Sequence, residues 1–150
     1  MNNLTKMKIM KPANEVFEAV VDPEKIGNFW FTSSSARWEQ GKTITLRYDE
    51  YDAQGDIQVL EIEDNRKIVY RWGYEDGGEG NVVTITLNES ENGGTIVEVN
   101  EEGFDDNDEE LLNQMIGNKE GWVYMLTCLK GYLEFGVSGL RAALVKPLYG

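Results

Sequence analysis

Apolar and polar residues alternate along the middle of the chain, which is the pattern of strands buried on one face. This alternation predicts strands over residues 42–49, 57–62, 67–74, 81–87 and 95–101. In the second strand, Val59 and Leu60 are consecutive apolar residues, which predicts a β-bulge. Turn-forming residues separate the strands at 54–56, 64–65, 77–80 and 92–94. Such short connections predict an antiparallel sheet.

A strand and two helices are expected before this β region. Residues 5–9 form a short strand candidate, and Pro12 is expected to open a helix because proline is tolerated at the first helical position. The apolar stripe of this helix is Val16, Phe17 and Val20. Asp22 and Pro23 end it, and a short second helix is expected over residues 24–26.

Helical periodicity returns at the C-terminal end. Asp106 and Glu109 resemble a capping box for a helix whose apolar side starts at Leu111, and Gly117 with Asn118 is expected to break or kink it. Residues 119–135 give the strongest helical signal, with the stripe Trp122, Met125, Leu126, Leu129 and Leu133. Glycines 136 and 139 are end signals. The tail then carries Leu140, Leu144, Val145, Leu148 and Tyr149, which are expected to pack on the body or on a partner.

The order of these elements is strand, helices, about five antiparallel strands and one long helix. A long amphipathic helix must bury its stripe, and the apolar face of the sheet is the only large surface available. The sequence therefore predicts an α+β fold in one domain over residues 1–150, with the antiparallel β-sheet packed on the C-terminal α-helix.

Charge and composition narrow the possible functions. The chain holds 14 Lys and Arg against 27 Asp and Glu, a net charge of −13, which disfavours nucleic acid and membrane surfaces as partners. There is no histidine, so Ser-His-Asp and Cys-His catalysis are excluded. The single cysteine, Cys128, is expected to be a buried, inert thiol. The first ten residues lack the apolar run of a signal peptide, so we expect a cytoplasmic protein.

Five stretches, in their order and spacing, are similar to a known family. They are residues 12–23 (PANEVFEAVVDP), 26–30 (IGNFW), 38–41 (WEQG), 59–72 (VLEIEDNRKIVYRW) and 121–133 (GWVYMLTCLKGYL). They resemble the START-like superfamily, also called SRPBCC or helix-grip, which includes birch-pollen-allergen-like proteins and polyketide cyclases. The subgroup they resemble is the domain of the activator of the 90-kDa heat-shock-protein ATPase and its bacterial homologues. The resemblance covers about 5–135, and the tail, 137–150, falls outside it.

The resemblance implies a fold and a choice of functions. The implied fold is a curved antiparallel sheet wrapped around the long C-terminal helix, with a cavity between them. Many members bind small apolar ligands, some are cyclases, and the eukaryotic namesake is a co-chaperone. Fold alone does not choose among these functions.

Aromatic residues are the first candidates for a ligand site, because ligand cavities favour aromatic walls with a few polar groups. The predicted aromatic ligand-binding residues are Trp30, Trp38, Tyr48, Tyr70, Trp72 and Trp122. The predicted apolar ones are Leu46, Val59, Val83, Ile85, Met125, Leu126 and Leu129. For each residue singly, packing in an ordinary core is the alternative interpretation.

Charged residues within the strands have two interpretations. Glu61 and Glu98 are expected to face outward, where Arg47 and Arg71 can pair with them across strands. The alternative is an inward carboxylate that acts as an acid or base.

The acidic run at residues 101–110 suggests calcium, but it fails the calcium-loop template. Counted from Asp105, the sixth position is Glu110 where glycine is needed. We expect a solvated start of the C-terminal helix, with weak cation binding as the alternative.

These observations lead to a ranked set of hypotheses. The first is a domain that binds a small, largely apolar molecule of lipid, flavonoid or polyketide type, with no catalytic residue, cofactor or metal predicted. The alternatives are a protein–protein module that stimulates a heat-shock chaperone ATPase, and a polyketide-cyclase-like enzyme. The strongly acidic charge counts against the chaperone, and the absence of histidine counts against the cyclase. The protein is expected to be a monomer or a homodimer.

Overall fold

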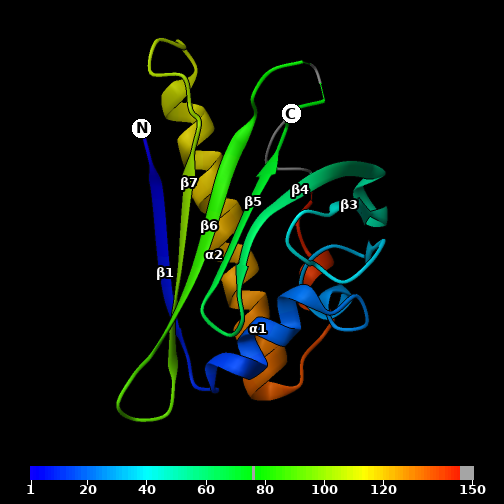
Figure 1. The fold of residues 1–150 in the computed structure, drawn as a ribbon, viewed down its shortest axis with the longest axis vertical. Helices are drawn as coiled ribbons and strands as arrows, with labels where there is room; N and C mark the ends of the chain where they lie inside the picture. Colours follow the sequence, from blue (N-terminus) through cyan, green and yellow to red (C-terminus); the bar gives the residue numbers. More distant parts are fainter. Residues whose placement is uncertain (76, 146–150) are drawn as a thin grey trace.

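A curved antiparallel sheet and a long helix form the body of the molecule in a computed structural model that describes residues 1–75 and 77–145 (Figure 1). The strands are β1 (Asn3–Ile9), β2 (Ser33–Ser34), β3 (Thr43–Tyr48), β4 (Ala53–Glu63), β5 (Lys67–Trp72), β6 (Asn81–Glu89) and β7 (Thr95–Glu102). The helices are α1 (Ala13–Val21) and α2 (Leu111–Phe135). Three short 3-10 turns are η1 (Ile26–Asn28), η2 (Asp49–Tyr51) and η3 (Leu140–Ala142).

The sheet is antiparallel throughout, with the strand order β1-β7-β6-β5-β4-β3-β2. The first strand, β1, therefore pairs with the last strand, β7, so all seven strands belong to one sheet. The α+β fold class predicted from the sequence is confirmed, with one short α-helix after the first strand. The predicted bulge is also present, because the β4–β5 register shifts between Val59 and Glu61.

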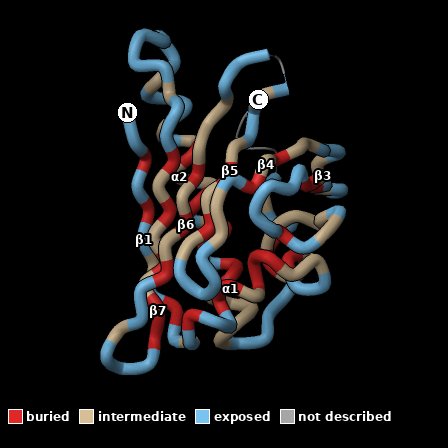
Figure 2. Tube along the Cα trace, in the orientation of Figure 1, coloured by how far each residue is buried: buried red, intermediate tan, exposed pale blue. Residues whose placement is uncertain are grey.

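Helix α2 buries the predicted stripe against the inner face of the sheet. Trp122, Met125, Leu126 and Leu129 are at most 7% exposed, and Leu133 is half-buried. The helix ends where Gly136 adopts a left-handed conformation with φ 69°, as its glycine predicts. Buried residues collect on the strands and helices that face each other, so the core lies between sheet and helix (Figure 2). Helix α1 lies at the end of the sheet where α2 terminates (Figure 1).

The predicted turn at residues 54–56 is wrong. These residues lie inside β4, where Gly55 pairs with Leu46 of β3. The chain reverses earlier, at η2, and Asp52 takes the left-handed conformation with φ 50° that closes it. Aspartate tolerates this conformation because its short side chain can hydrogen-bond locally. The turn is predicted at Gly55 because glycine is a stronger turn signal than Asp52, where the turn lies.

The predicted break at Gly117 and Asn118 is also wrong, because α2 runs through both residues without interruption. Asn118 is buried and hydrogen-bonded across to the sheet, and these tertiary contacts outweigh its low helix propensity. The predicted capping box does not form either. The helix begins at Leu111, its N-cap is Glu110, and no side chain caps it.

Smaller differences concern element ends. Pro12 is the N-cap of α1 and not its first helical residue. The short second helix is the 3-10 turn η1, which starts two residues later than predicted. The two-residue strand β2 was not predicted, because so short a segment has no apolar alternation to show.

Candidate functional site

A cavity of about 910 Å³ lies between the sheet and α2. This is the size of cavities that take drug-sized ligands. Ten aromatic residues line it: Phe29, Trp30, Phe31, Tyr48, Tyr51, Tyr70, Trp72, Phe104, Trp122 and Tyr124. They come from the segment after η1, from β3 to β5, from the loop after β7 and from α2. The wall is therefore assembled from parts of the chain that lie far apart in the sequence.

The structure divides the thirteen predicted ligand-binding residues into two groups. Those in the cavity wall are Trp30, Leu46, Tyr48, Tyr70, Trp72, Trp122 and Met125. Those outside it are Trp38, Val59, Val83, Ile85, Leu126 and Leu129, and each is at most 1% exposed in the packed core. The second group belongs to the cluster of buried core residues, and none of its members lines the cavity. A ligand-binding role for the first group stays a prediction.

Trp30 joins the two groups through ring contacts. Its ring centroid lies 5.6 Å from that of Trp122, 5.9 Å from that of Trp38 and 4.7 Å from that of Phe31. Trp38 in turn makes an edge contact with Tyr70 at 5.2 Å. These spacings are those of favourable aromatic pairs, so this wall of the cavity is a packed surface and not a set of independent side chains.

Glu101 is the residue in the cavity wall that sequence reasoning missed. It is 1% exposed, although it opens the acidic run that was expected to be solvated. Four N–H groups donate to its carboxylate. Asn81 (2.8 Å) and the Trp72 indole (3.0 Å) donate to Oε2, and Asn118 and the Trp122 indole (both 2.9 Å) donate to Oε1. We call these five residues the Glu101 cluster.

The fold brings the Glu101 cluster together through strand register and helical spacing. Glu101 pairs with Val83, which pairs with Tyr70, so all three lie on one row across β7, β6 and β5. Trp72 pairs with Asn81 on the next row of the same face. From α2, Asn118 and Trp122 are four residues apart and point to the same side. The conformation of the chain just beyond β7 requires glycine, since Gly103 has φ 115° and a Cβ there would lie 2.6 Å from Asn81 Oδ1.

The hydrogen bonds of the Glu101 cluster match an ionised carboxylate. An indole N–H can only donate, and each carboxylate oxygen already receives two donors. A proton on either oxygen would find no acceptor in this set. Both carboxylate oxygens use their lone pairs for these bonds, so Glu101 has no free site to accept a proton from a substrate. The arrangement can place a negative charge in the cavity wall, and it is poorly suited to general base catalysis.

Tyr70 lies beside this charge and is nearly buried, with 4% of its surface exposed. Burial, reinforced by the charge of Glu101, raises its pKa well above the ordinary tyrosine value. Its ring lines the cavity, and its hydroxyl makes no hydrogen bond with any residue that the structure describes. Tyr70 therefore offers the cavity a neutral hydroxyl that can both donate and accept.

Two signals in the sequence pointed to this cluster. Val97 and Val99 are apolar alternate residues of β7 that face inward, and the same two-residue period makes Glu101 the next inward residue of this strand. Asn118 lies one helical turn before Trp122, so it continues the predicted stripe of α2. In the sequence alone, Asn118 instead indicates a helix break, and Glu101 belongs to an acidic run that is expected to be solvated.

Glu61 and Glu98 lie on the outer surface of the sheet, as expected, but each pairs with a lysine. Glu98 Oε1 lies 3.8 Å from Lys6 Nζ, and Glu61 Oε2 lies 2.6 Å from Lys67 Nζ. Arg47 instead pairs with Asp49, which lies two residues further along the chain in η2. The pairing predicted with arginines is wrong because lysines stand closer in the actual register.

The rest of the acidic run, residues 105–110, is exposed before α2, as predicted. Within residues 1–75 and 77–145, no group of three or more candidate ligand side chains could hold a metal ion. Cys128 is buried as predicted, and burial raises its thiol pKa above the ordinary value. No described helix is both long enough and apolar enough to cross a membrane.

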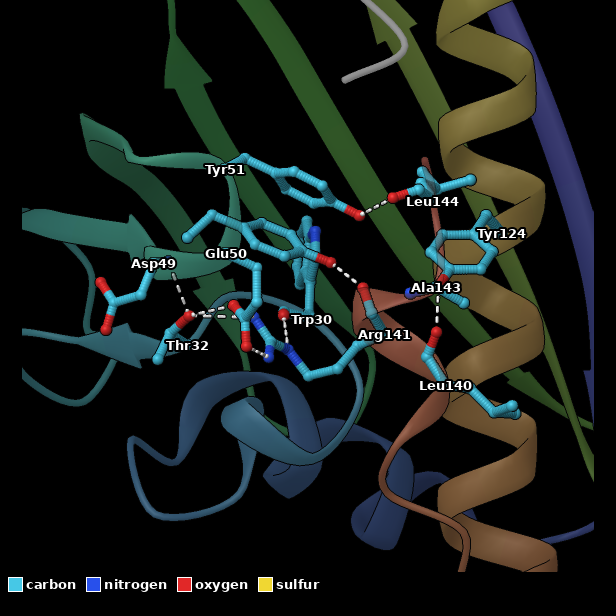
Figure 3. Close-up of polar contacts among 11 residues, drawn as sticks. Trp30, Thr32, Asp49, Glu50, Tyr51, Tyr124, Leu140, Arg141, Ala143 and Leu144 are labelled. Carbon is cyan, nitrogen blue, oxygen red and sulfur yellow. Dashed lines mark hydrogen bonds and ion pairs between the residues drawn. The ribbon is translucent and has the colours of Figure 1, made fainter. Parts of the chain in front are cut away.

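The C-terminal segment, residues 137–145, packs beside the cavity through Arg141 (Figure 3). Arg141 is 7% exposed, and its guanidinium bonds both carboxylate oxygens of Glu50 at 2.7 and 2.9 Å. It also donates to Thr32 Oγ1 at 2.9 Å and to the Trp30 carbonyl oxygen. The guanidinium lies 4.6 Å from the centre of the Tyr48 ring. Arg141 thus ties the C-terminal segment to the segment after η1 and to η2.

Three tyrosines of the body hold the backbone of this segment. Tyr48, Tyr51 and Tyr124 donate to the carbonyl oxygens of Arg141, Leu144 and Leu140 respectively. Leu144 itself lines the cavity. The predicted packing of the tail on the body holds for Leu140 and Leu144, but not for Val145, which is fully exposed, and Leu148 and Tyr149 lie outside the described residues. Part of the cavity wall is therefore supplied by a segment beyond the region of family resemblance.

Electrostatics reinforce this attachment. The hydrogen bonds from Arg141 lower the pKa of Glu50 to about 2. Burial by itself would lower the pKa of the Arg141 guanidinium. The hydrogen bonds and negative charge of Glu50 outweigh burial, so this pKa is raised. Burial also raises the pKa of Tyr48, so its hydroxyl stays a neutral donor at physiological pH.

A curved antiparallel sheet that holds a long C-terminal helix, with an aromatic cavity between them, defines a START-like, helix-grip domain. Residues 11–134 match the family model described as Activator of Hsp90 ATPase homolog 1-like protein. This chain belongs to that family. Among curated proteins, none matches the chain.

Solved structures agree with this assignment. A crystal structure of a protein from Staphylococcus saprophyticus is 54% identical, with a TM-score of 0.80, and the match covers 92% of this chain and 95% of that one. The Aha1 dimer from Colwellia psychrerythraea is 19% identical with a TM-score of 0.78, covering 91% and 98%. DynU16, from the dynemicin biosynthetic locus, is 24% identical with a TM-score of 0.77, covering 91% of this chain and 48% of DynU16. The last two share the fold.

Proposed function

We propose that this domain binds a small, largely apolar molecule in the cavity between the sheet and α2. The observation that carries the proposal is a cavity of about 910 Å³ whose wall contains ten aromatic residues. Burying such a wall against a ligand removes apolar surface from water, which is the main driving force for association. The protein acts as a cytoplasmic binding protein without a metal or cofactor in this proposal.

Two variants one helical turn apart test the proposal. Met125 lines the cavity, whereas Leu129 lies on the same stripe in the packed core. A panel of lipid, flavonoid and polyketide-type compounds is screened by tryptophan fluorescence and thermal shift. For a compound that binds, Met125→Ala should weaken affinity severalfold, whereas Leu129→Ala should leave affinity unchanged and lower stability by about 2–5 kcal/mol.

Two outcomes would contradict the proposal. One is the absence of any binding by the whole panel up to the solubility limit. The other is a loss of affinity in Leu129→Ala that equals the loss in Met125→Ala, because the ligand would then not sit in the cavity.

A second candidate function is contact with a chaperone whose ATPase it stimulates. The family model carries the name of such an activator. The outer face of α2 also exposes Leu112 (72%), Ile116 (49%) and Val123 (43%), which are spaced by four and seven residues. Such spacing puts them on one side of the helix. We expect no stimulation of the chaperone ATPase of the same organism, and a severalfold, salt-sensitive increase would put this candidate first.

A further inference from the structure

Every charged side chain in the cavity wall is acidic. Asp56, Glu75, Glu101 and Asp105 line the cavity, and no lysine or arginine does so within residues 1–75 and 77–145. Resting on the proposed function, we infer that the ligand is an organic cation: an apolar body that carries a quaternary or tertiary ammonium group. An anionic head group would meet only like charge in this wall, where the low dielectric strengthens repulsion.

The Glu101 cluster provides the position for the ammonium group. The carboxylate of Glu101 is 1% exposed, and all four of its hydrogen-bond donors are neutral. None of the ion pairs among the described residues includes Glu101. Neutral donors spread a negative charge but do not cancel it. A buried charge without a counter-charge favours a cation bound beside it.

Aromatic rings next to Glu101 favour the same kind of head group. The indoles of Trp72 and Trp122 donate to the carboxylate, so their N–H edges lie against it, and both residues also line the cavity. Indole faces attract cations more strongly than other side-chain rings. A cation over either indole face in this part of the cavity would also lie in the field of the Glu101 carboxylate.

The hydrogen-bond count decides between kinds of amine. Both oxygens of Glu101 are already occupied by protein N–H groups, so a primary ammonium beside Glu101 would find no free acceptor on this carboxylate for its three N–H donors, at a desolvation cost. Tyr70 provides the independent indication of a ligand here. Tyr70 lines the cavity and is 4% exposed, and its hydroxyl has no hydrogen-bond partner among the described residues. It can accept one N–H bond, so a head group with at most one N–H fits best.

Three probes that share one apolar body and differ in head group test the inference. They are naphthylmethyl-trimethylammonium, naphthylmethanol and naphthylacetate. Calorimetric titration of the full chain at low and moderate salt measures their affinities. We expect the cation to bind at least about tenfold more tightly than the alcohol, with the carboxylate weakest.

Variants at two glutamates locate the charge that gives this preference. Glu101→Gln should remove most of the preference for the cation over the alcohol. Glu98→Gln is the matched control, because Glu98 lies three residues away on the same strand but faces outward beside Lys6. It removes the same net charge and should leave the preference intact. If Glu101→Gln does not fold, Trp72→Leu serves instead, since Trp72 is 40% exposed and its loss should reduce the preference severalfold.

The outcomes separate this inference from the proposed function. Binding of the alcohol or the carboxylate as tightly as the cation would overturn the cationic ligand class and leave the cavity as a binding site. Failure of all three probes, together with the wider panel, would overturn the proposed function itself. An equal loss of preference in Glu101→Gln and Glu98→Gln would show that net charge, and not the Glu101 cluster, selects the ligand.

Discussion

Two buried charges lie beside the same cavity, and the fold treats them differently. Arg141 is compensated by the carboxylate of Glu50, which bonds it through two oxygens. Glu101 is surrounded by four neutral N–H donors and has no ion-pair partner in the described chain. A compensated charge is typical of a structural contact, here one that fastens the C-terminal segment. An uncompensated charge in a cavity wall leaves room for a ligand to supply the opposite charge.

The two sites also differ in how deeply they are embedded. Glu101 connects β5, β6, β7 and α2, all parts of the central body. Arg141 fastens a peripheral segment to the segment after η1 and to η2. We therefore expect damage at Glu101 to affect the whole fold and damage at Arg141 to open one side of the cavity.

The largest effect is expected for Glu101→Leu. This change leaves four buried N–H donors without an acceptor, and unsatisfied buried groups cost about 1–3 kcal/mol each before any relaxation or entry of water. We expect global stability to fall by about 3–5 kcal/mol in urea unfolding. Glu98→Leu, on the outer face of the same strand, should change stability by less than about 1 kcal/mol. Equal effects of the two changes would mean that the Glu101 cluster is not the central contact described above.

Arg141→Met should have a smaller effect of a different kind. It keeps the length of the side chain but removes the charged contacts to Glu50 and Thr32, each worth about 1.5–3 kcal/mol at most. Because the hydrogen bonds of the Arg141 guanidinium go to the segment after η1 and to η2, and not to the central strands, global stability should fall by less than in Glu101→Leu. Hydrogen exchange should accelerate at the amide of Ala143, which donates to Tyr124, and not in β6 or β7. Uniform acceleration across the sheet would contradict a local role.

A weaker effect is expected when Glu50 is titrated. Its pKa is lowered to about 2 in the folded protein from an ordinary value of 4.5. A lowered folded pKa stabilises the protein fully above the ordinary value, and this contribution disappears as the pH falls toward 2. Wild type and Glu50→Gln should therefore differ in melting temperature at pH 6 and converge between about pH 4.5 and 2. A difference that stays constant over this range would mean that Arg141 does not hold Glu50 ionised.

The smallest effect is expected at Cys128, which reports on attachment of the C-terminal segment. Burial raises the pKa of this thiol, so labelling by a thiol reagent at pH 7.5 should be slow in the wild type. In Arg141→Met the rate should rise severalfold because the segment that covers this side of α2 detaches more often. Glu134→Gln near the end of α2, where Glu134 pairs with Lys130, is a control that should leave the rate unchanged. Unchanged labelling in Arg141→Met would show that the segment does not depend on this arginine.

The sequence by itself determined the architecture. Alternation marked β3 to β7, the stripe from Trp122 to Leu129 marked the buried side of α2, and Gly136 marked its end. These signals are local, since each comes from burial of one face of one element or from the backbone of one residue. The family resemblance joined them into the expected order, and seven of the thirteen predicted ligand-binding residues lie in the cavity wall.

Tertiary structure decided which polar residues were buried and where the cavity lay. Asn118 reads as a helix breaker and Glu101 as part of a solvated acidic run, because a single sequence shows no partner for either. Their burial depends on β7, β6 and α2 meeting, which places four N–H donors around one carboxylate. The division between cavity wall and core has the same origin, because Met125 and Leu129 follow one helical pattern. Which of the two has a void beside it depends on how the sheet, α2 and the connecting segments assemble around the cavity.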